Sequence, residues 1–164
     1  MEEIILEKDA LITSKTDLKG NIIYANNDFL KYAGYEVSEL LLKPHNIVRH
    51  EDMPRTVFKC LWDYIQNGKE IFAFVKNKAK DGRYYWVFAN VTASFDEQGN
   101  IINYYSVRRA PNRKVLPLIE EIYKTLLEKE KQGGINAGIQ ALNDIINSHK
   151  TYYNHLIFNL QENS

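Results

Sequence analysis

The segment from Pro44 to Pro54, PHNIVRHEDMP, concentrates side chains that can bind a charged ligand. Arg49 and His50 can meet an anionic group, because a guanidinium binds phosphate or carboxylate oxygens bidentately. Asp52 can orient that arginine or accept a hydrogen bond from a hydroxyl group. A charged segment of this kind is more often a solvated loop, so the residue types alone leave both interpretations open.

Four further polar or aromatic residues, Asn26, Trp62, Asn77 and Arg108, allow both a binding and a structural interpretation, and residue type alone does not single them out. Trp62 can form the apolar wall of a pocket for a flat ligand, and Asn77 can offer its polar edge a donor and an acceptor. Each also has a purely structural interpretation. Trp62 can belong to the core, Asn77 can cap a turn, Asn26 can cap the helix that follows it, and Arg108 can form a surface ion pair.

No catalytic constellation accompanies these candidates. The sequence contains no phosphate-binding loop, no GxSxG or HExxH motif and no paired acid and base. His149 and His155 are six residues apart, which is a poor spacing for a shared metal ion on a helix. We therefore expect a binding protein without a metal site rather than an enzyme.

The composition argues against several other classes of protein. The 164 residues suffice for one domain and an appendage, and 21 Lys and Arg balance 21 Asp and Glu, which gives no electrostatic case for nucleic-acid binding. The longest apolar runs are too short to cross a bilayer, and the acidic first residues do not resemble a signal peptide. The single cysteine, Cys60, cannot form an internal disulfide and fits a reducing cytoplasm.

Hydrophobic periodicity predicts the elements that must position the candidate residues. Strands are expected over residues 10–16, 22–25, 71–77, 83–95 and 101–109. Short helices are expected over 29–33 and 38–40, a loop over 44–52 and a longer helix over 55–66. This order predicts an α+β fold in which a five-stranded antiparallel sheet carries short helices on one face and encloses a cavity beneath them.

The two ends of the chain have a different character from this main domain, which we expect over residues 10–110. Residues 1–9 form an N-terminal cap that could be a short helix, and residues 111–164 form a tail. Apolar residues at helical spacing predict tail helices over 112–131 and 135–160, hinged at Gly133-Gly134. Because two helices are too few for a core of their own, their apolar stripes need another surface.

Four motifs follow one another in the main domain: TDLKGNI at 16–22, ANNDF at 25–29, PHNIVRHEDMP at 44–54, and DG followed by YWV within 81–87. Together they resemble the PAS family. More narrowly, they resemble the PAS domains of Aer-type aerotaxis (energy-taxis) receptors, including stand-alone PAS partners of membrane-bound chemotaxis transducers. The motif at 44–54 is the most specific, and the order of predicted elements agrees with a PAS fold.

In that family the PAS domain binds FAD non-covalently and reports its redox state. The resemblance assigns to FAD the residues Arg49, His50, Asp52, Trp62 and Asn77, with Asn26 as a weaker candidate. Compared with LOV domains, another flavin-binding branch, Asn77 matches an amide at the ring edge and Arg108 matches the glutamine beside the reactive nitrogen. Asn46 matches the photoactive cysteine, which makes it an eighth candidate for contact with the flavin, and the light-driven thiol chemistry of LOV domains is not expected.

The resemblance thus implies a cytoplasmic, FAD-binding redox sensor for energy taxis. It would signal by contact with a membrane-bound chemotaxis transducer, which would recruit it to the inner face of the membrane. Its tail would also suit a homodimer. Two alternatives stay open: a sensor of another ligand, such as a small metabolite or haem held by His45 or His50, and a PAS interaction module without a ligand.

Overall fold

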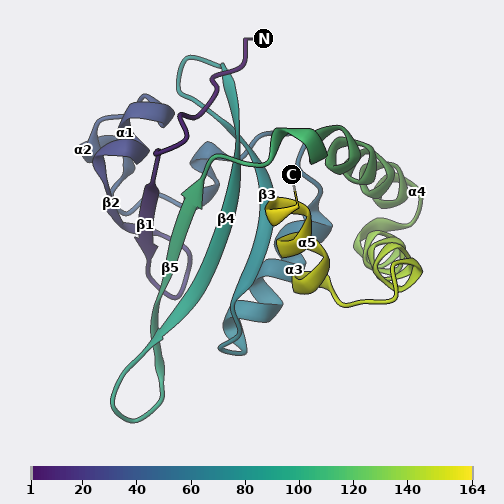
Figure 1. Cartoon of the computed structure of the whole chain (residues 1–164). Helices are drawn as coiled ribbons and strands as arrows, with labels where there is room; N and C mark the ends of the chain where they lie inside the picture. Colours follow the sequence, from purple (N-terminus) through teal and green to yellow (C-terminus); the bar gives the residue numbers. More distant parts are fainter. Residues whose placement is uncertain (1, 164) are drawn as a thin grey trace.

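Five antiparallel strands form one sheet at the centre of the molecule, in the order β2-β1-β5-β4-β3 (Figure 1). A computed structural model describes residues 2–163. The strands are β1 (Ile12–Thr16), β2 (Ile22–Ala25), β3 (Ile71–Lys78), β4 (Tyr84–Phe95) and β5 (Ile101–Arg109). The predicted α+β fold is confirmed, and each strand lies within two residues of its expected bounds.

The turns β1–β2 and β4–β5 use the same pairing of aspartate and glycine. Asp17 Oδ1 accepts hydrogen bonds from two backbone N–H groups of its own turn, each at 2.9 Å, and Asp96 Oδ1 does the same in the other turn. Gly20 has a φ of 88° and Gly99 a φ of 82°, a backbone conformation that favours glycine. These two turns make β1 and β2, and likewise β4 and β5, antiparallel neighbours in the sheet.

Short helices and one longer helix cover the inner face of the sheet: α1 (Asn27–Ala33), α2 (Val37–Leu40), the 3₁₀ helix η1 (His45–Val48) and α3 (Arg55–Gln66). The expectation of an irregular loop over 44–52 is partly wrong, since its first half forms η1. Pro44 precedes this turn with a φ of −58°, so its ring helps the chain to enter it. As a result His45 and Arg49 lie one turn apart.

The tail consists of a second 3₁₀ turn, η2 (Arg113–Val115), followed by α4 (Leu116–Ser148) and α5 (Tyr153–Glu162). The predicted hinge is present, because Gly133 and Gly134 have non-helical dihedral angles inside α4. The single helix expected over 135–160 is wrong. The chain leaves the helix after Ser148, where Lys150 has a φ of 55°, and resumes at Tyr153.

The tail folds back on the main domain and covers the free edge of β3 (Figure 1). Tyr123 of α4 donates a hydrogen bond to the Phe74 carbonyl. Asn154 of α5 accepts from Phe72 N–H at 3.0 Å and donates to the Glu70 carbonyl at 2.8 Å. These contacts satisfy backbone groups that an edge strand would otherwise expose to other chains. The division into main domain and tail stays a prediction, but the two pack as one structure.

The short helix that the sequence allowed for residues 1–9 does not form in the described part of that range, residues 2–9. Instead Ile4 N–H donates to the Tyr84 carbonyl at 2.7 Å, and Tyr84 N–H donates to the Glu2 carbonyl at 3.2 Å. Glu3 also forms a salt bridge of 2.9 Å with Arg113 at the start of the tail. Pairing with the first residue of β4 therefore draws this segment into an extended conformation.

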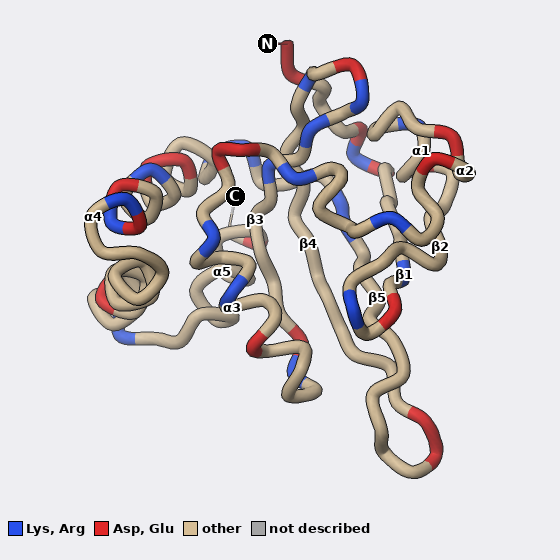
Figure 2. Tube along the Cα trace, turned by 180° about the vertical axis from the view of Figure 1, so that it is seen from behind, with Lys and Arg blue, Asp and Glu red and all other residues tan. Residues whose placement is uncertain are grey.

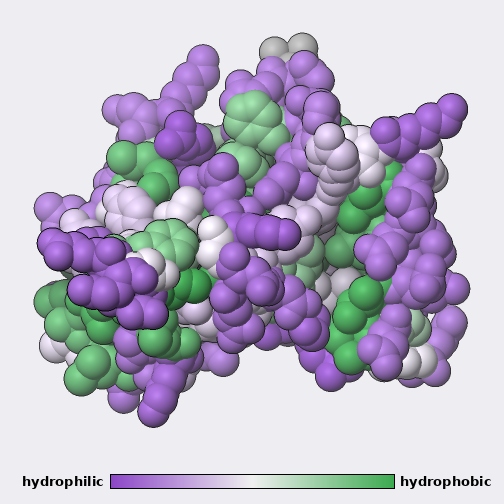
Figure 3. All heavy atoms as spheres, turned by 90° about the horizontal axis from the view of Figure 1, so that it is seen from below, coloured by the Kyte–Doolittle hydropathy of each residue, from purple (hydrophilic) through white to green (hydrophobic). Residues whose placement is uncertain are grey.

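The surface is mixed in charge and in hydropathy. Segments of Lys and Arg and segments of Asp and Glu are scattered over the whole trace (Figure 2), in agreement with the net charge of zero. Viewed from below, apolar side chains reach the surface on the side of α2 and β2 (Figure 3), where Leu42 is 73% exposed. Within residues 2–163, no helix combines the length and the hydropathy needed to cross a membrane.

Candidate functional site

A cavity of about 320 Å³ lies between the inner face of the sheet and α3. Its apolar lining includes Trp62 and Ile65 of α3, Val91 of β4 and Tyr104 of β5. The Trp62 ring packs edge-on against Tyr104, with ring centroids 5.6 Å apart. Cavities of a few hundred cubic ångströms with apolar walls and a few polar groups are typical sites for small molecules and cofactors.

Arg108 forms the charged end of this cavity, although it is only 4% exposed. Its Nη1 lies 2.9 Å from His45 Nε2, and its Nη2 donates to Ser14 Oγ at 2.8 Å. Its Nε is buried and has no hydrogen-bond partner among the described residues, and no carboxylate in that range lies within ion-pair distance of it. Burial lowers the pKa of Arg108 to about 10, so the guanidinium stays charged at neutral pH.

His45 is the neutral partner of this buried cation. Burial, reinforced by the charge of Arg108, lowers the pKa of His45 to about 3. Its Nε2 accepts from Arg108 and also lies 3.0 Å from Ser14 Oγ, which places the imidazole proton on Nδ1. The cavity end therefore carries one positive charge that these two neighbours orient but do not neutralise.

Two further candidates, Asn77 and Arg49, also line the cavity. Asn77 of β3 is 5% exposed and lines the cavity, and its backbone pairs with that of Arg49. The Arg49 guanidinium lies over the Phe58 ring of α3, 4.1 Å from its centroid. Asn46 lines the cavity between Arg49 and the charged end. The structure thus brings together five of the eight candidates: Asn46, Arg49, Trp62, Asn77 and Arg108.

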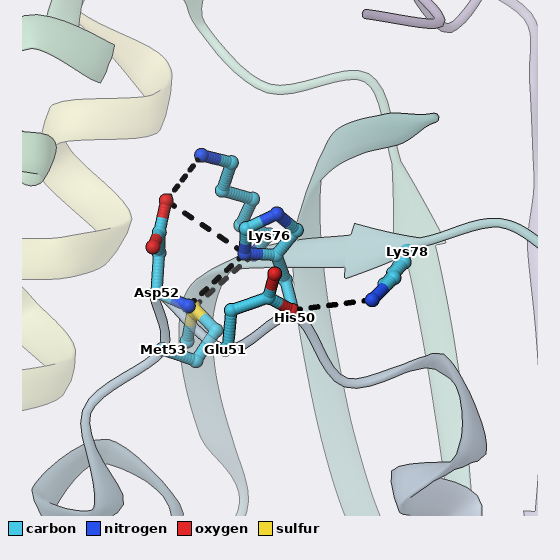
Figure 4. A network of polar contacts seen from close by, with 6 residues as sticks. All are labelled: His50, Glu51, Asp52, Met53, Lys76 and Lys78. Atoms are coloured by element: carbon cyan, nitrogen blue, oxygen red, sulfur yellow. Dashed lines mark hydrogen bonds and ion pairs between the residues drawn. The ribbon is translucent and has the colours of Figure 1, made fainter. Parts of the chain in front are cut away.

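His50 and Asp52 do not line this cavity; they attach the loop to β3 (Figure 4). His50 Nδ1 accepts from Asp52 N–H at 3.0 Å, and Asp52 Oδ2 accepts from Lys76 Nζ at 2.8 Å. Lys76 N–H in turn lies 3.2 Å from Met53 Sδ. Both side chains are predicted to contact a ligand, but here the His50 ring bonds to the backbone of its own loop and the Asp52 carboxylate bonds to Lys76 of β3.

Asn26 also lies outside the cavity and acts as a helix cap. Its Oδ1 accepts from Phe29 N–H and from Thr13 N–H, both at 3.0 Å, and its Nδ2 donates to the Leu11 carbonyl. With these three bonds its amide joins the start of α1 to β1. The structural interpretation of Asn26 is therefore the one that the geometry supports.

Sequence reasoning passed over Ser14, and it considered His45 only as a haem ligand. Ser14 lies on the same face of β1 as Ile12 and Thr16, so strand periodicity could have placed it on the inner face. Nothing in the sequence joins Ser14 and His45 to Arg108, which lies more than sixty residues beyond both. Within residues 2–163 no cluster of His, Cys, Asp and Glu could hold a metal ion.

The sequence model of the PAS fold matches residues 22–108. The chain is 36% identical to the aerotaxis receptor of Escherichia coli (strain K12) over 134 residues, 82% of this chain and 26% of that protein. It is 27% identical to the nitrogen fixation regulatory protein of Klebsiella pneumoniae over 64% of this chain and 21% of that protein. The chain therefore spans only about a quarter of the length of these relatives.

Solved structures agree with this assignment. The light-state structure of the blue-light photoreceptor Aureochrome1 LOV superposes with a TM-score of 0.59 at 26% identity, over 67% of this chain and 89% of that one. The family match, the strand order and the cavity under α3 lead to one conclusion: this chain belongs to the PAS fold family and resembles the PAS domains of Aer-type aerotaxis receptors.

Proposed function

We propose that this chain is an FAD-binding redox sensor for energy taxis, which signals by contact with a chemotaxis transducer. The observation that carries the proposal is Arg108, a buried cation at the end of the cavity with an unpartnered Nε. A buried charge without a partner is costly, so this position favours a ligand that brings an acceptor or a negative charge. The similarity to the aerotaxis receptor supplies the context of taxis.

The residues around the cavity suit a flat ligand with an anionic extension. Lys19, Arg49 and Arg108 line the cavity, and its described lining includes no Asp or Glu. This charge complements the pyrophosphate of FAD. Trp62 and Tyr104 offer apolar walls to a ring system, and Asn77 offers a donor and an acceptor to its polar edge.

The protein residues would tune the cofactor and read its state. When bound, FAD supplies reversible uptake of electrons and protons. Arg108 would stabilise negative charge at its end of the cavity, and His45 and Ser14 would hold the guanidinium in place. Arg108 lies on β5, one residue before the strand ends, so a shift of this side chain acts directly on the segment that leads into the tail. We propose no catalytic role for the chain.

The geometry offers less support to the alternatives. A haem would need a free imidazole, but His45 Nε2 already accepts from Arg108, and His50 lies outside the cavity. LOV-type thiol chemistry would need a cysteine, but Cys60 is not among the lining residues, and burial raises its pKa to about 11. The transducer contact, the homodimer and the location at the inner face of the membrane are part of the proposal and rest on the resemblance.

A visible absorption spectrum of the purified protein tests the proposal. We expect the two bands of an oxidised flavin, bleached by dithionite and restored by air, and the release of FAD on heating. FMN in place of FAD would correct the identity of the cofactor. A Soret band would favour haem, and a colourless protein that takes up no added FAD would leave a PAS interaction module.

A further inference from the structure

Glu130 of α4 forms the N-terminal cap of α3, although it lies more than seventy positions after the first residues of that helix in the sequence. Its Oε2 accepts from Thr56 N–H at 2.9 Å and from Thr56 Oγ1 at 2.7 Å, and its Oε1 accepts from Arg55 N–H at 3.3 Å. The residue that precedes α3 is Pro54, which has no side-chain oxygen to cap the helix. A residue of the tail therefore supplies the helix cap that a side chain next to the helix usually provides.

The contact between α4 and α3 is close as well as polar. Glu130 is 9% exposed, so its charge is removed from most of the solvent. Gly138, which follows the Gly133-Gly134 break in α4, lies so near to Thr56 that a Cβ at this position would overlap with Thr56 Oγ1. Any larger residue there would push α4 away from the start of α3.

The same contact borders the ligand cavity. The face of α3 that follows Thr56 carries Phe58 and Trp62, two cavity walls. A second pocket lies between the 46–55 loop and α4, and both Glu130 and Arg49 line it. Arg49 also lines the main cavity, so its guanidinium can interact with a charge in the main cavity or in the second pocket. Burial lowers the pKa of Arg49, and the carboxylate of Glu130 opposes this effect.

We propose that Glu130 is a latch that holds the tail on α3, and that an anionic ligand at Arg49 weakens it. Glu130 forms its ion pair with Arg55, Nε to Oε1 at 3.7 Å, and shares the second pocket with Arg49. An anion in the main cavity would draw on the Arg49 guanidinium, which lines both pockets, and it would repel the Glu130 carboxylate. The tail would then separate from the N-terminus of α3. This regulation rests on the proposed function, because it takes the pyrophosphate of FAD as the anion.

The coupling must act in both directions. If an anionic ligand weakens the contact between tail and α3, then loss of that contact must strengthen binding of the ligand by the same factor. Glu130→Gln removes the charge and should therefore loosen the tail and tighten FAD binding together. A merely structural cap would loosen the tail without improving affinity.

Hydrogen exchange of the full chain tests the latch without any ligand. In the FAD-free protein we expect Glu130→Gln and Gly138→Ala to speed amide exchange in α4 and α5 by at least about tenfold, while β4 and β5 keep wild-type protection. The matched controls are Glu128→Gln and Asn136→Ala, at exposed positions of the same helix. Unchanged exchange in both test variants would overturn the latch.

A second experiment adds either FAD or riboflavin. Riboflavin carries the flavin ring without the pyrophosphate. We expect FAD to speed exchange of the wild-type tail, riboflavin to leave it unchanged, and Glu130→Gln to bind FAD about fivefold more tightly than Glu128→Gln. Equal effects of FAD and riboflavin, or weaker FAD binding by Glu130→Gln, would overturn the role of the anion. If neither flavin binds, the proposed function fails and so does the proposed effect of the anion. Hydrogen exchange of the FAD-free variants then still decides whether the latch exists.

Discussion

Arg108 has an unusual environment for an arginine, because its polar partners among residues 2–163 are neutral. His45 and Ser14 contact the two terminal nitrogens, and the buried Nε has no hydrogen-bond partner among residues 2–163. Phe29 lies beneath the guanidinium, with its ring centroid 5.0 Å away, and limits the directions in which the group can move. A side chain held in this way can stabilise negative charge on a ligand without a large rearrangement.

We expect Arg108→Gln to make the reduction potential of the bound flavin more negative by about 30–60 mV. The variant loses a charge-assisted hydrogen bond worth about 1.5–3 kcal/mol, and about 1.4 kcal/mol corresponds to 30 mV for a two-electron couple. Spectroelectrochemistry measures the shift, and Arg109→Gln, exposed on the same strand, is the control. An unchanged or more positive potential in Arg108→Gln would mean that this side chain does not favour the reduced state.

His45 makes the stability of the fold depend on pH. The unfolded chain binds this proton near pH 6.5 and the folded chain only near pH 3, so more protons are bound on unfolding in this range. The contribution to stability is complete above pH 6.5 and declines as the pH falls, by about 1.4 kcal/mol per pH unit.

We therefore expect wild-type protein to lose about 2–3 kcal/mol more unfolding free energy than His45→Gln between pH 7 and pH 4.5. The glutamine oxygen can still accept from Arg108 but does not titrate in this range. Denaturant unfolding at both pH values measures the difference. His149→Gln, at an exposed position, should behave like wild type, and equal pH dependence in all three proteins would contradict the buried, neutral state of His45.

At the scale of the elements, the β1–β2 turn supports a wall of the cavity as well as a hairpin. A Cβ at Gly20 would lie 3.0 Å from the Trp62 ring, whereas a Cβ at Gly99 would meet nothing within 4 Å. Both glycines have a positive φ, so the two turns differ mainly in what lies beside them. The turn and the tryptophan of α3 therefore fix each other's position.

We expect Gly20→Ala and Gly99→Ala each to lose about 1–2 kcal/mol of unfolding free energy, because alanine is strained at positive φ. Gly20→Ala should lose more, and it alone should shift tryptophan fluorescence and weaken flavin binding, because the methyl group displaces Trp62. Thermal unfolding and a flavin titration of both variants measure these effects. Equal losses with unchanged fluorescence would show that the turn does not position Trp62.

At the scale of the whole molecule, the tail closes the edge of the sheet. Asn154 binds one N–H and one carbonyl of the β3 edge, and Phe158 packs on Phe72 with ring centroids 5.1 Å apart. The tail thus occupies part of the surface that a partner strand could use. Release of the tail would change which surface the molecule presents to other proteins.

We expect Asn154→Ala to destabilise the docked tail by about 1–3 kcal/mol, because it leaves two backbone groups of the β3 edge without partners. Exchange of the Phe72 amide should become faster, which residue-resolved hydrogen exchange measures. Asn159→Ala changes an exposed asparagine of the same helix and is the control. Protection of Phe72 that is the same in both variants would show that this side chain does not hold the edge.

The sequence alone determined the five strands of the sheet, because the pattern that indicates a strand is formed by residues close together in the chain. Alternating β-branched and aromatic residues and Asp/Gly turns predicted all five strands within two residues of their bounds. The motif at 44–54 located the wall of the cavity, and the Gly133-Gly134 pair located the break in α4. Of the candidate residues, Asn46, Arg49, Trp62, Asn77 and Arg108 do line one cavity.

Only the tertiary structure decided which polar groups pair with one another. His50 and Asp52 have ligand-binding side chains, but β3 brings Lys76 within 2.8 Å of Asp52, and Asn26 caps a helix. His45, Ser14 and Arg108 meet at one end of the cavity, and Glu130 reaches Thr56 from the tail. These partners are distant in the sequence, and no local periodicity encodes them, because they depend on how the sheet, α3 and the tail pack in space.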